Sequence, residues 1–150
     1  MGRAAMHDLA SRALFEEEVQ KLRPELLEAR GWTLFAKEYP ILDVGFSARD
    51  GAKIRLRIFC QEWNDRPPSV DLLDWSGQRL PAIQRDPAGV FNNSAHPQTG
   101  RPFICMKGVR EYHTHPSHTG DAWEAIKGSD NFTLGGILTQ LWHVWRTLHK

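Results

Sequence analysis

Cys105 is the side chain in this sequence that is best suited to nucleophilic chemistry. It lies in the Pro- and Gly-containing segment 96–108, with Arg101 and Lys107 close to it in sequence. Cationic neighbours favour the thiolate, which is the form of cysteine that attacks carbonyl carbons. We therefore predict a reactive thiol at Cys105. The alternative is that this side chain only packs beside the apolar residues that precede it.

Histidines are concentrated in the same part of the chain, since four of the seven lie between His96 and His118. His113 and His115 are two residues apart, so an extended backbone would place both imidazoles on one side. Such a pair is a good Zn²⁺ chelate, and tetrahedral coordination would draw its other ligands from nearby side chains. The predicted zinc ligands are His113, His115, His118 and Asp121, with Glu124 as a further candidate. Alternatively, these histidines cap and hydrogen-bond an irregular loop.

The tetrapeptide at residues 113–116, His-Thr-His-Pro, is also similar to the histidine pair of the JAMM zinc isopeptidases, which remove ubiquitin-like tags. That family places a metal-binding aspartate at a fixed distance after its second histidine, and the corresponding position here is Ala125. The match therefore fails at a metal ligand, and a zinc hydrolase is the weakest of the alternatives.

Cys60 is expected to have a different role from Cys105. It ends the segment 53–60, in which apolar side chains alternate with Arg55 and Arg57. A period of two is typical of a strand with one buried face, and Cys60 falls on the apolar face. We predict that Cys60 is a small buried hydrophobic residue.

Two segments with helical periodicity lie before and after the other predicted elements in the sequence. Apolar residues near a 3.6-residue spacing predict a helix from Asp8 to Arg23, which Pro24 ends before a short further turn over 25–29. A wide apolar face predicts a second long helix over 133–148.

Strand signals follow the first helix, and a long irregular stretch follows the strands. Alternation and turn residues, including Asp50-Gly51, predict strands at 32–39, 41–48, 53–60 and 69–75. Residues 76–130 have little periodicity, and a loop of this length within a domain is usually either functional or disordered. The apolar segments 90–91 and 103–106 favour an anchored loop over a disordered one. The sequence thus predicts a single α+β domain over residues 1–150, with an N-terminal helix, a four-strand antiparallel meander, a long active-site loop and a C-terminal helix.

Composition excludes several classes of protein. Nineteen Lys and Arg against eighteen Asp and Glu give a net charge of +1, which argues against a broad electrostatic surface for nucleic acid or anionic lipid. The chain has no run of about 18 apolar residues, so we expect no membrane span. Two cysteines, and a first segment without the apolar core of a secretory signal, indicate a cytoplasmic protein.

The order of these elements resembles the ubiquitin-conjugating (E2) fold, especially that of divergent bacterial E2-like proteins. The family's proline-containing approach to its fourth strand is similar to residues 63–70, Trp-Asn-Asp-Arg-Pro-Pro-Ser-Val. The start of its His-Pro-Asn flap is similar to His96-Pro97, and its active-site segment is similar to residues 103–106, Phe-Ile-Cys-Met. Its crossover helix corresponds to residues 131–145.

This resemblance implies an activity. An E2-like protein would accept a ubiquitin-like modifier from an E1-like activating enzyme as a thioester on Cys105, and would pass it to a target protein. The resemblance further implies a stand-alone bacterial protein, encoded beside its E1 and modifier in a defence operon. It implies no cofactor, so zinc belongs only to the alternative of a metal-binding E2-fold protein without transfer activity.

The implied chemistry needs an oxyanion donor and a base. Gln98 stands where the family's flap has asparagine, so the candidate donors are Gln98, Asn92, Asn93 and backbone N–H groups near Cys105. The candidate bases are His113, His115 and Asp121, and we expect one of the two histidines to replace the polarising role of the missing asparagine. The predicted catalytic set is Cys105, His96, Gln98, His113, His115 and Asp121.

Overall fold

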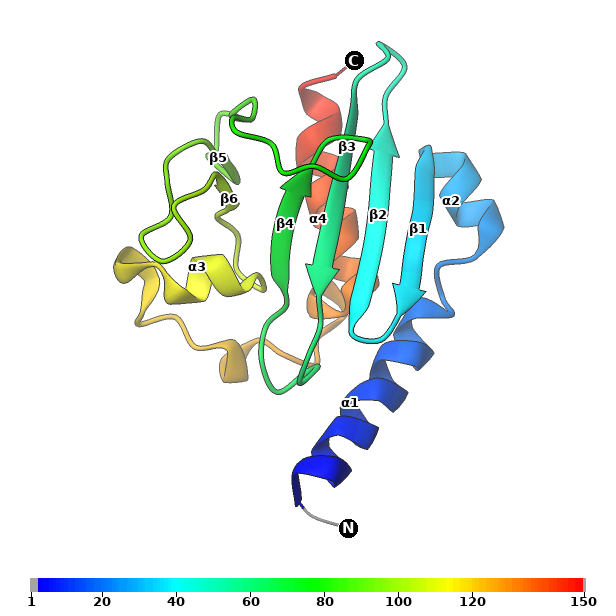
Figure 1. Ribbon diagram of the computed structural model, residues 1–150, viewed down its shortest axis with the longest axis vertical. Coiled ribbons are helices and arrows are strands. Elements are labelled where there is room, and N and C mark those ends of the chain that lie inside the picture. The colour runs from blue at the N-terminus through cyan, green and yellow to red at the C-terminus, as the bar shows by residue number, and fades with distance from the viewer. Residues whose placement is uncertain (1–2, 150) are drawn as a thin grey trace.

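The computed structural model describes residues 3–149 and has the predicted α+β architecture (Figure 1). The helices are α1 (Arg3–Val19), α2 (Pro24–Arg30), α3 (Arg110–Thr114) and α4 (Leu134–Thr147). The strands are β1 (Trp32–Glu38), β2 (Ile41–Ser47), β3 (Lys53–Phe59), β4 (Ser69–Leu73), β5 (Phe91–Asn92) and β6 (Phe103–Ile104). Three short 3₁₀ turns complete the set: η1 (Pro116–His118), η2 (Trp123–Ala125) and η3 (Asp130–Phe132). None of the helices within residues 3–149 combines the length and apolar character that crossing a membrane requires.

The four long strands form an antiparallel meander in the order β1-β2-β3-β4, which confirms the predicted sheet. The β2–β3 hairpin turns at Asp50 and Gly51, where Gly51 has a φ of +90° and the Asp50 carboxylate accepts a hydrogen bond from the Ala52 N–H. The positive φ explains why glycine occupies this position. Register follows the alternation in sequence, with Leu56 opposite Val44 and Leu72.

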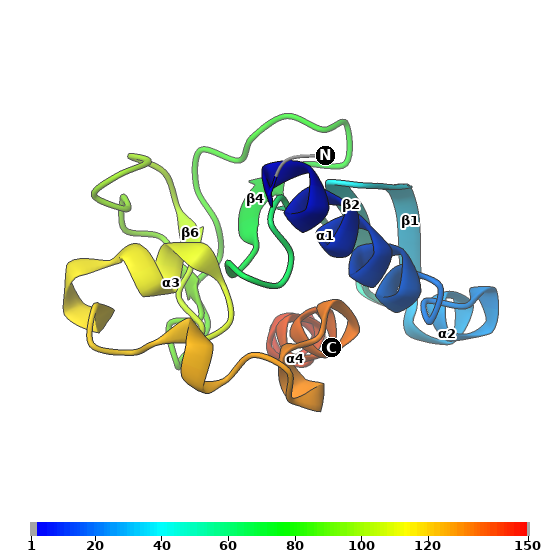
Figure 2. The ribbon, with the colours of Figure 1, turned by 90° about the horizontal axis from the view of Figure 1, so that it is seen from below.

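Helix α4 covers one face of this sheet, as Figures 1 and 2 show from two directions. Thr133 begins it as an N-cap, because its side-chain oxygen accepts a hydrogen bond from the Gly136 N–H. The apolar face of α4 packs on the alternate side chains of the strands to form the core. The fully buried members of this core include Leu42, Val44, Phe46, Leu56, Ile58, Ile137, Leu138 and Leu141.

The N-terminal helix differs from its prediction at both ends, because α1 begins at Arg3 rather than at Asp8 and ends at Val19 rather than at Arg23. Pro24 lies in the first turn of α2. Proline is favoured in that position because its missing N–H would have no helical partner there. Leu9, an apolar residue on α1, is 52% exposed, so the apolar spacing of this segment does not place it in the core.

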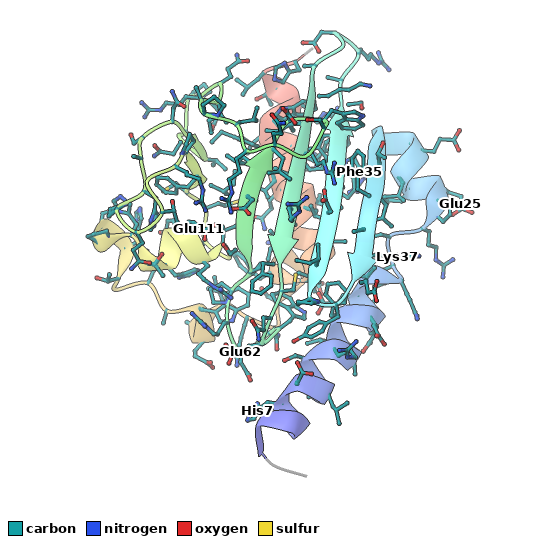
Figure 3. All side chains as sticks on the ribbon, viewed as in Figure 1. His7, Glu25, Phe35, Lys37, Glu62 and Glu111 are labelled. Carbon is teal, nitrogen blue, oxygen red and sulfur yellow. The ribbon has the colours of Figure 1, made fainter. Side chains whose placement is uncertain are left out.

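The other face of the sheet carries charged and aromatic side chains. Asp43 is only 1% exposed and accepts hydrogen bonds from Arg55 at 2.8 and 2.9 Å and from Arg57 at 3.3 Å. Phe35, on the exposed side of β1 in Figure 3, contacts Trp75 edge to face. The outward arginines of β3 therefore neutralise a buried carboxylate within the sheet.

The predicted loop over 76–130 is largely irregular but is well anchored. β5 and β6 pair antiparallel, and α3 packs beyond β4 at the edge of the sheet (Figure 1). Trp123 is 6% exposed, and its indole N–H donates to the Asn64 carbonyl at 2.7 Å, which ties the end of this loop to the β3–β4 connection. The loop thus forms a second layer of structure beside the sheet.

Candidate active site

Cys105 directly follows β6, and its two predecessors anchor it. Phe103 and Ile104 are 2% and 0% exposed, while Cys105 is half-buried at the surface. The Cys105 backbone N–H donates to the Val90 carbonyl at 2.7 Å, so this donor is already used within the fold. The strand pair therefore fixes the backbone at Cys105 and leaves its thiol partly accessible.

Glu111 holds helix α3 against the sheet, in the position labelled in Figure 3. Its carboxylate accepts hydrogen bonds from the Val70 N–H at 2.8 Å and the Ser69 hydroxyl at 2.7 Å. The side chain is 6% exposed, and this burial raises the pKa of Glu111. One carboxylate thus connects β4 to the segment that faces Cys105.

His96 connects the predicted flap to the same helix. It is 1% exposed, and its Nδ1 accepts a hydrogen bond from the Gln98 N–H at 3.1 Å. Because Nδ1 is the acceptor, Nε2 carries the proton and donates to the Glu111 carbonyl at 2.8 Å. Both ring nitrogens of His96 therefore form hydrogen bonds that stabilise the loop. The Gln98 side chain is exposed.

His118 is the imidazole that the fold brings to the thiol. Its Nε2 lies 3.7 Å from Cys105 Sγ, within hydrogen-bonding distance for sulfur. Its Nδ1 lies 3.8 Å from Asp121 Oδ2, on the other side of the ring. The three side chains therefore lie in the order thiol, imidazole, carboxylate, which is an arrangement that can move a proton from sulfur to nitrogen.

Tyr112 contacts both partners of this arrangement. Its ring stacks on the His118 ring, with centroids 4.0 Å apart and 14° between planes. Its hydroxyl donates to Asp121 Oδ2 at 2.6 Å. This hydrogen bond raises the pKa of Tyr112 to about 12 and lowers the pKa of the Asp121 carboxyl. Asp121 is therefore held as an anion beside the imidazole.

The thiol itself is not acidified by its sequence neighbours. We expected Arg101 and Lys107 to favour the thiolate, but burial raises the pKa of the Cys105 thiol. Arg101 instead contacts Asp71, at 3.4 Å, and Lys107 is exposed. A thiol that rests in the protonated form needs a base when it attacks, and His118 is the imidazole within reach.

His113 and His115 lie nearby but are engaged elsewhere. His113 accepts a hydrogen bond from the Gly108 N–H at Nε2 and has the Asp121 carbonyl 3.1 Å from Nδ1. His115 accepts from Ser117 at Nδ1, and its ring stacks on Phe103.

These hydrogen bonds also bear on the predicted zinc ligands. Within residues 3–149, no three His, Cys, Asp or Glu side chains are grouped so that they could hold a metal ion. A metal bound at either ring nitrogen of His113 would have to displace the hydrogen bond that this nitrogen makes, so the observed role of the residue is that of a loop histidine.

Asn92 and Asn93, two of the candidate oxyanion donors, form hydrogen bonds within the loop. The Asn92 side-chain oxygen accepts from the Ser94 N–H, and that of Asn93 accepts from the Ile83 N–H. Asn92 pairs with Phe103 across β5 and β6, so it lies close in space to the cysteine segment. These amide side chains stabilise turns around the site.

From the sequence, Cys105 and Asp121 are predicted to be catalytic, whereas His118 is predicted only as a metal ligand. The available signal was the three-residue spacing of His118 and Asp121 across a turn that follows Pro116. Tyr112 had no chemical signal of its own, because its role depends on α3 lying against η1.

Comparisons with known proteins place this site within a region of similarity. Residues 87–146 match the family model described as Y4jH-like, and this segment contains Cys105, Tyr112, His118 and Asp121. The chain is also similar to the uncharacterized protein y4jH of Sinorhizobium fredii (strain NBRC 101917 / NGR234), with 24% identity over 164 residues that cover 87% of this chain and 80% of the relative. The likeness to y4jH thus extends over most of both chains, while the family match is concentrated on the loop and α4.

Proposed function

We propose that this protein is a bacterial E2-like conjugating protein that carries a ubiquitin-like modifier as a thioester on Cys105. The observation that carries the proposal is the half-buried Cys105 thiol, 3.7 Å from His118 Nε2, on a loop anchored beside a four-strand meander. The order of helix, meander, cysteine loop and α4 supports it, because this order resembles that of E2 proteins.

Loading of the modifier is a thioester exchange. Cys105 Sγ attacks the carbonyl carbon of the modifier's thioester on the E1-like enzyme, and His118 Nε2 takes the thiol proton. The carbonyl–sulfur bond to the E1 thiol then breaks, and the departing thiolate accepts that proton. The raised pKa of Cys105 makes this base important, since the thiol rests protonated.

Transfer to the target uses the same imidazole. An amine of the target protein attacks the Cys105 thioester, His118 removes a proton from it, and Cys105 leaves as the thiolate that is then reprotonated. The anionic Asp121, held by Tyr112, stabilises the imidazolium that forms in either step. The exposed Gln98 side chain is the candidate oxyanion donor, and a well-aimed donor contributes roughly 3–4 kcal/mol.

A chemical donor tests the thiol step without any partner protein. The full chain is incubated with a synthetic Gly-Gly thioester of 2-mercaptoethanesulfonate, and the intact mass is measured before and after hydroxylamine. We expect one diglycyl group on Cys105, removed by hydroxylamine. Cys60→Ala should behave like the wild type and Cys105→Ala should gain no acyl group. Acylation of Cys105→Ala would move the nucleophile elsewhere.

The biological step is tested with the E1-like enzyme and modifier that we propose are encoded beside this gene. With both proteins and ATP, non-reducing electrophoresis should reveal an adduct that a reductant removes. When the E1 has been loaded with modifier beforehand, so that Mg²⁺ and ATP are no longer needed, the adduct should form equally with and without EDTA, because the thiol chemistry uses no metal. Loss of the adduct on adding the chelator to the preloaded E1 would favour the zinc alternative. Failure to form it, when the diglycyl thioester does acylate Cys105, would overturn the conjugating role and leave a general acyl-accepting thiol.

A further inference from the structure

We infer that a groove between α2 and the end of α4 binds an acidic peptide segment of a partner protein. The groove has a volume of about 710 Å³, and the end of β2 forms its third side. It lies on the α2 side of the sheet, whereas the Cys105 site lies beyond β4 at the other edge (Figure 1). The inference is therefore independent of the thioester chemistry.

The charges that line the groove have one sign. Within residues 3–149, the ionisable side chains that line it are those of Arg30, Arg49, Arg146 and His149, and none of the lining residues carries a carboxylate. Among the residues that the structure describes, the three arginines form no ion pair, whereas His149 contacts Asp50 at 3.2 Å. In a chain with a net charge of +1, such a local excess of guanidinium groups favours an anionic ligand.

Two of these guanidinium groups are held in place by tryptophan rings. The Arg30 guanidinium lies 5.1 Å from the Trp32 ring and 5.0 Å from the Trp142 ring, and it donates to the Thr139 hydroxyl at 2.8 Å. The Arg146 guanidinium lies 4.5 Å from the same Trp142 ring. Stacked guanidinium groups lose little further freedom on binding, and their edges match the two oxygens of a carboxylate.

The same contacts favour a peptide over a nucleic acid. Single-stranded nucleic acids bind through bases that stack on open aromatic rings beside a long basic surface. Here the Trp142 ring already carries two guanidinium groups, and a net charge of +1 argues against a long basic surface. The lining also includes the apolar side chains of Ala48 and Trp145, which suit an apolar side chain next to the carboxylates of an acidic peptide.

Fluorescence anisotropy of a labelled short peptide, made of glutamate and glycine with one central leucine, tests the inference on the full chain. We expect saturable binding that weakens as salt is added. The variant Arg49→Gln/Arg146→Gln should weaken binding by about tenfold for each arginine that contacts a carboxylate. Both side chains are exposed, so circular dichroism melting should be close to that of the wild type.

Arg66→Gln is the matched control, because Arg66 is an exposed arginine at the opposite end of the sheet. It should leave the affinity unchanged, and the same peptide with glutamine in place of glutamate should not bind the wild type. Equal binding of both peptides, or an equal loss in Arg66→Gln, would overturn the inference. Tighter binding of an oligothymidine than of the acidic peptide would overturn it in favour of nucleic acid.

Discussion

Cys60 and Cys105 occupy two regions of the molecule that are built in different ways. Cys60 follows β3 on the core face of the sheet, is 1% exposed, and has its thiol 3.7 Å from the Ile58 carbonyl. Burial, with the nearby Glu18 carboxylate, raises the pKa of Cys60 far above its ordinary value. Cys105 follows a two-residue strand in the loop region, is half-buried, and has an imidazole within reach.

The difference lies in how many elements contribute to each environment. The pleat of the sheet directs Cys60 to the core, where side chains are selected for packing. Around Cys105, three separate pieces converge: Tyr112 from α3, His118 from η1, and Asp121 from the segment that follows. A thiol therefore becomes chemically useful in this fold where irregular backbone can bring polar groups to it.

Replacing Cys105 should have the largest of the expected effects, because it removes the thiol that is accessible in the native protein. In native protein treated with iodoacetamide, we expect modification at Cys105 alone, because Cys60 is not accessible. Cys105→Ser should therefore take up no label until it is unfolded. Mass spectrometry of digested protein reads both sites. Labelling of Cys60 in the native state would contradict the contrast between the two regions.

His118→Gln should have the next largest effect. Without the base, acylation of Cys105 by the diglycyl thioester at neutral pH should slow by about 10²-fold, within the usual range for general base catalysis. At a pH high enough to ionise the thiol fully, wild type and variant should react at the same rate. The pH–rate profile distinguishes these cases, and a constant ratio at every pH would show that His118 only shapes the site. His143→Gln, on the exposed side of α4, is the matched control.

The sheet could be predicted from sequence because its signals are local. The alternation of Ile54, Leu56 and Ile58 with arginines predicts a strand over 53–60, and β3 covers Lys53–Phe59. Gly31 follows α2 with a φ of +68°, the left-handed conformation that favours glycine at the end of a helix. Each of these features depends on residues within a few positions of one another, so one sequence is enough to predict them.

The site could be predicted only in part, for the opposite reason. Cys105 is conspicuous by residue type, but whether His113, His115 or His118 reaches it depends on how α3 and η1 pack. The Arg101 expectation was wrong because Asp71, thirty positions away in the chain, is its partner. Contacts between irregular segments leave no periodic signal in the sequence.

Tyr112→Phe should have a smaller effect than the loss of His118. Phenylalanine keeps the ring that stacks on His118 and loses only the hydrogen bond to Asp121, so we expect acylation to slow severalfold, as for a net hydrogen-bond contribution of about 1 kcal/mol. A direct spectroscopic readout is available, since Tyr39 and Tyr112 are the two tyrosines in the chain. Asp121→Asn should move one of the two phenol titrations down from about 12, because it removes the carboxylate that raises the pKa of Tyr112. If both titrations remained in place, Tyr112 would not be the partner of Asp121.

The smallest effect is expected for Glu111→Gln, which concerns stability rather than reactivity. Burial raises the pKa of Glu111 in the folded protein above its unfolded value, so the stability that this group contributes is fully present below the unfolded pKa and is lost as the pH rises through the folded pKa. Glutamine can still accept from the Val70 N–H and can donate to the Ser69 hydroxyl. We therefore expect the variant to lose less stability than the wild type between acidic and neutral pH in urea unfolding. Glu28→Gln, an exposed change, should leave that pH dependence unaltered.

Because α3 stays docked in Glu111→Gln, its acylation rate should equal that of the wild type, and a large drop would mean that the charge of Glu111 also acts on the thiol.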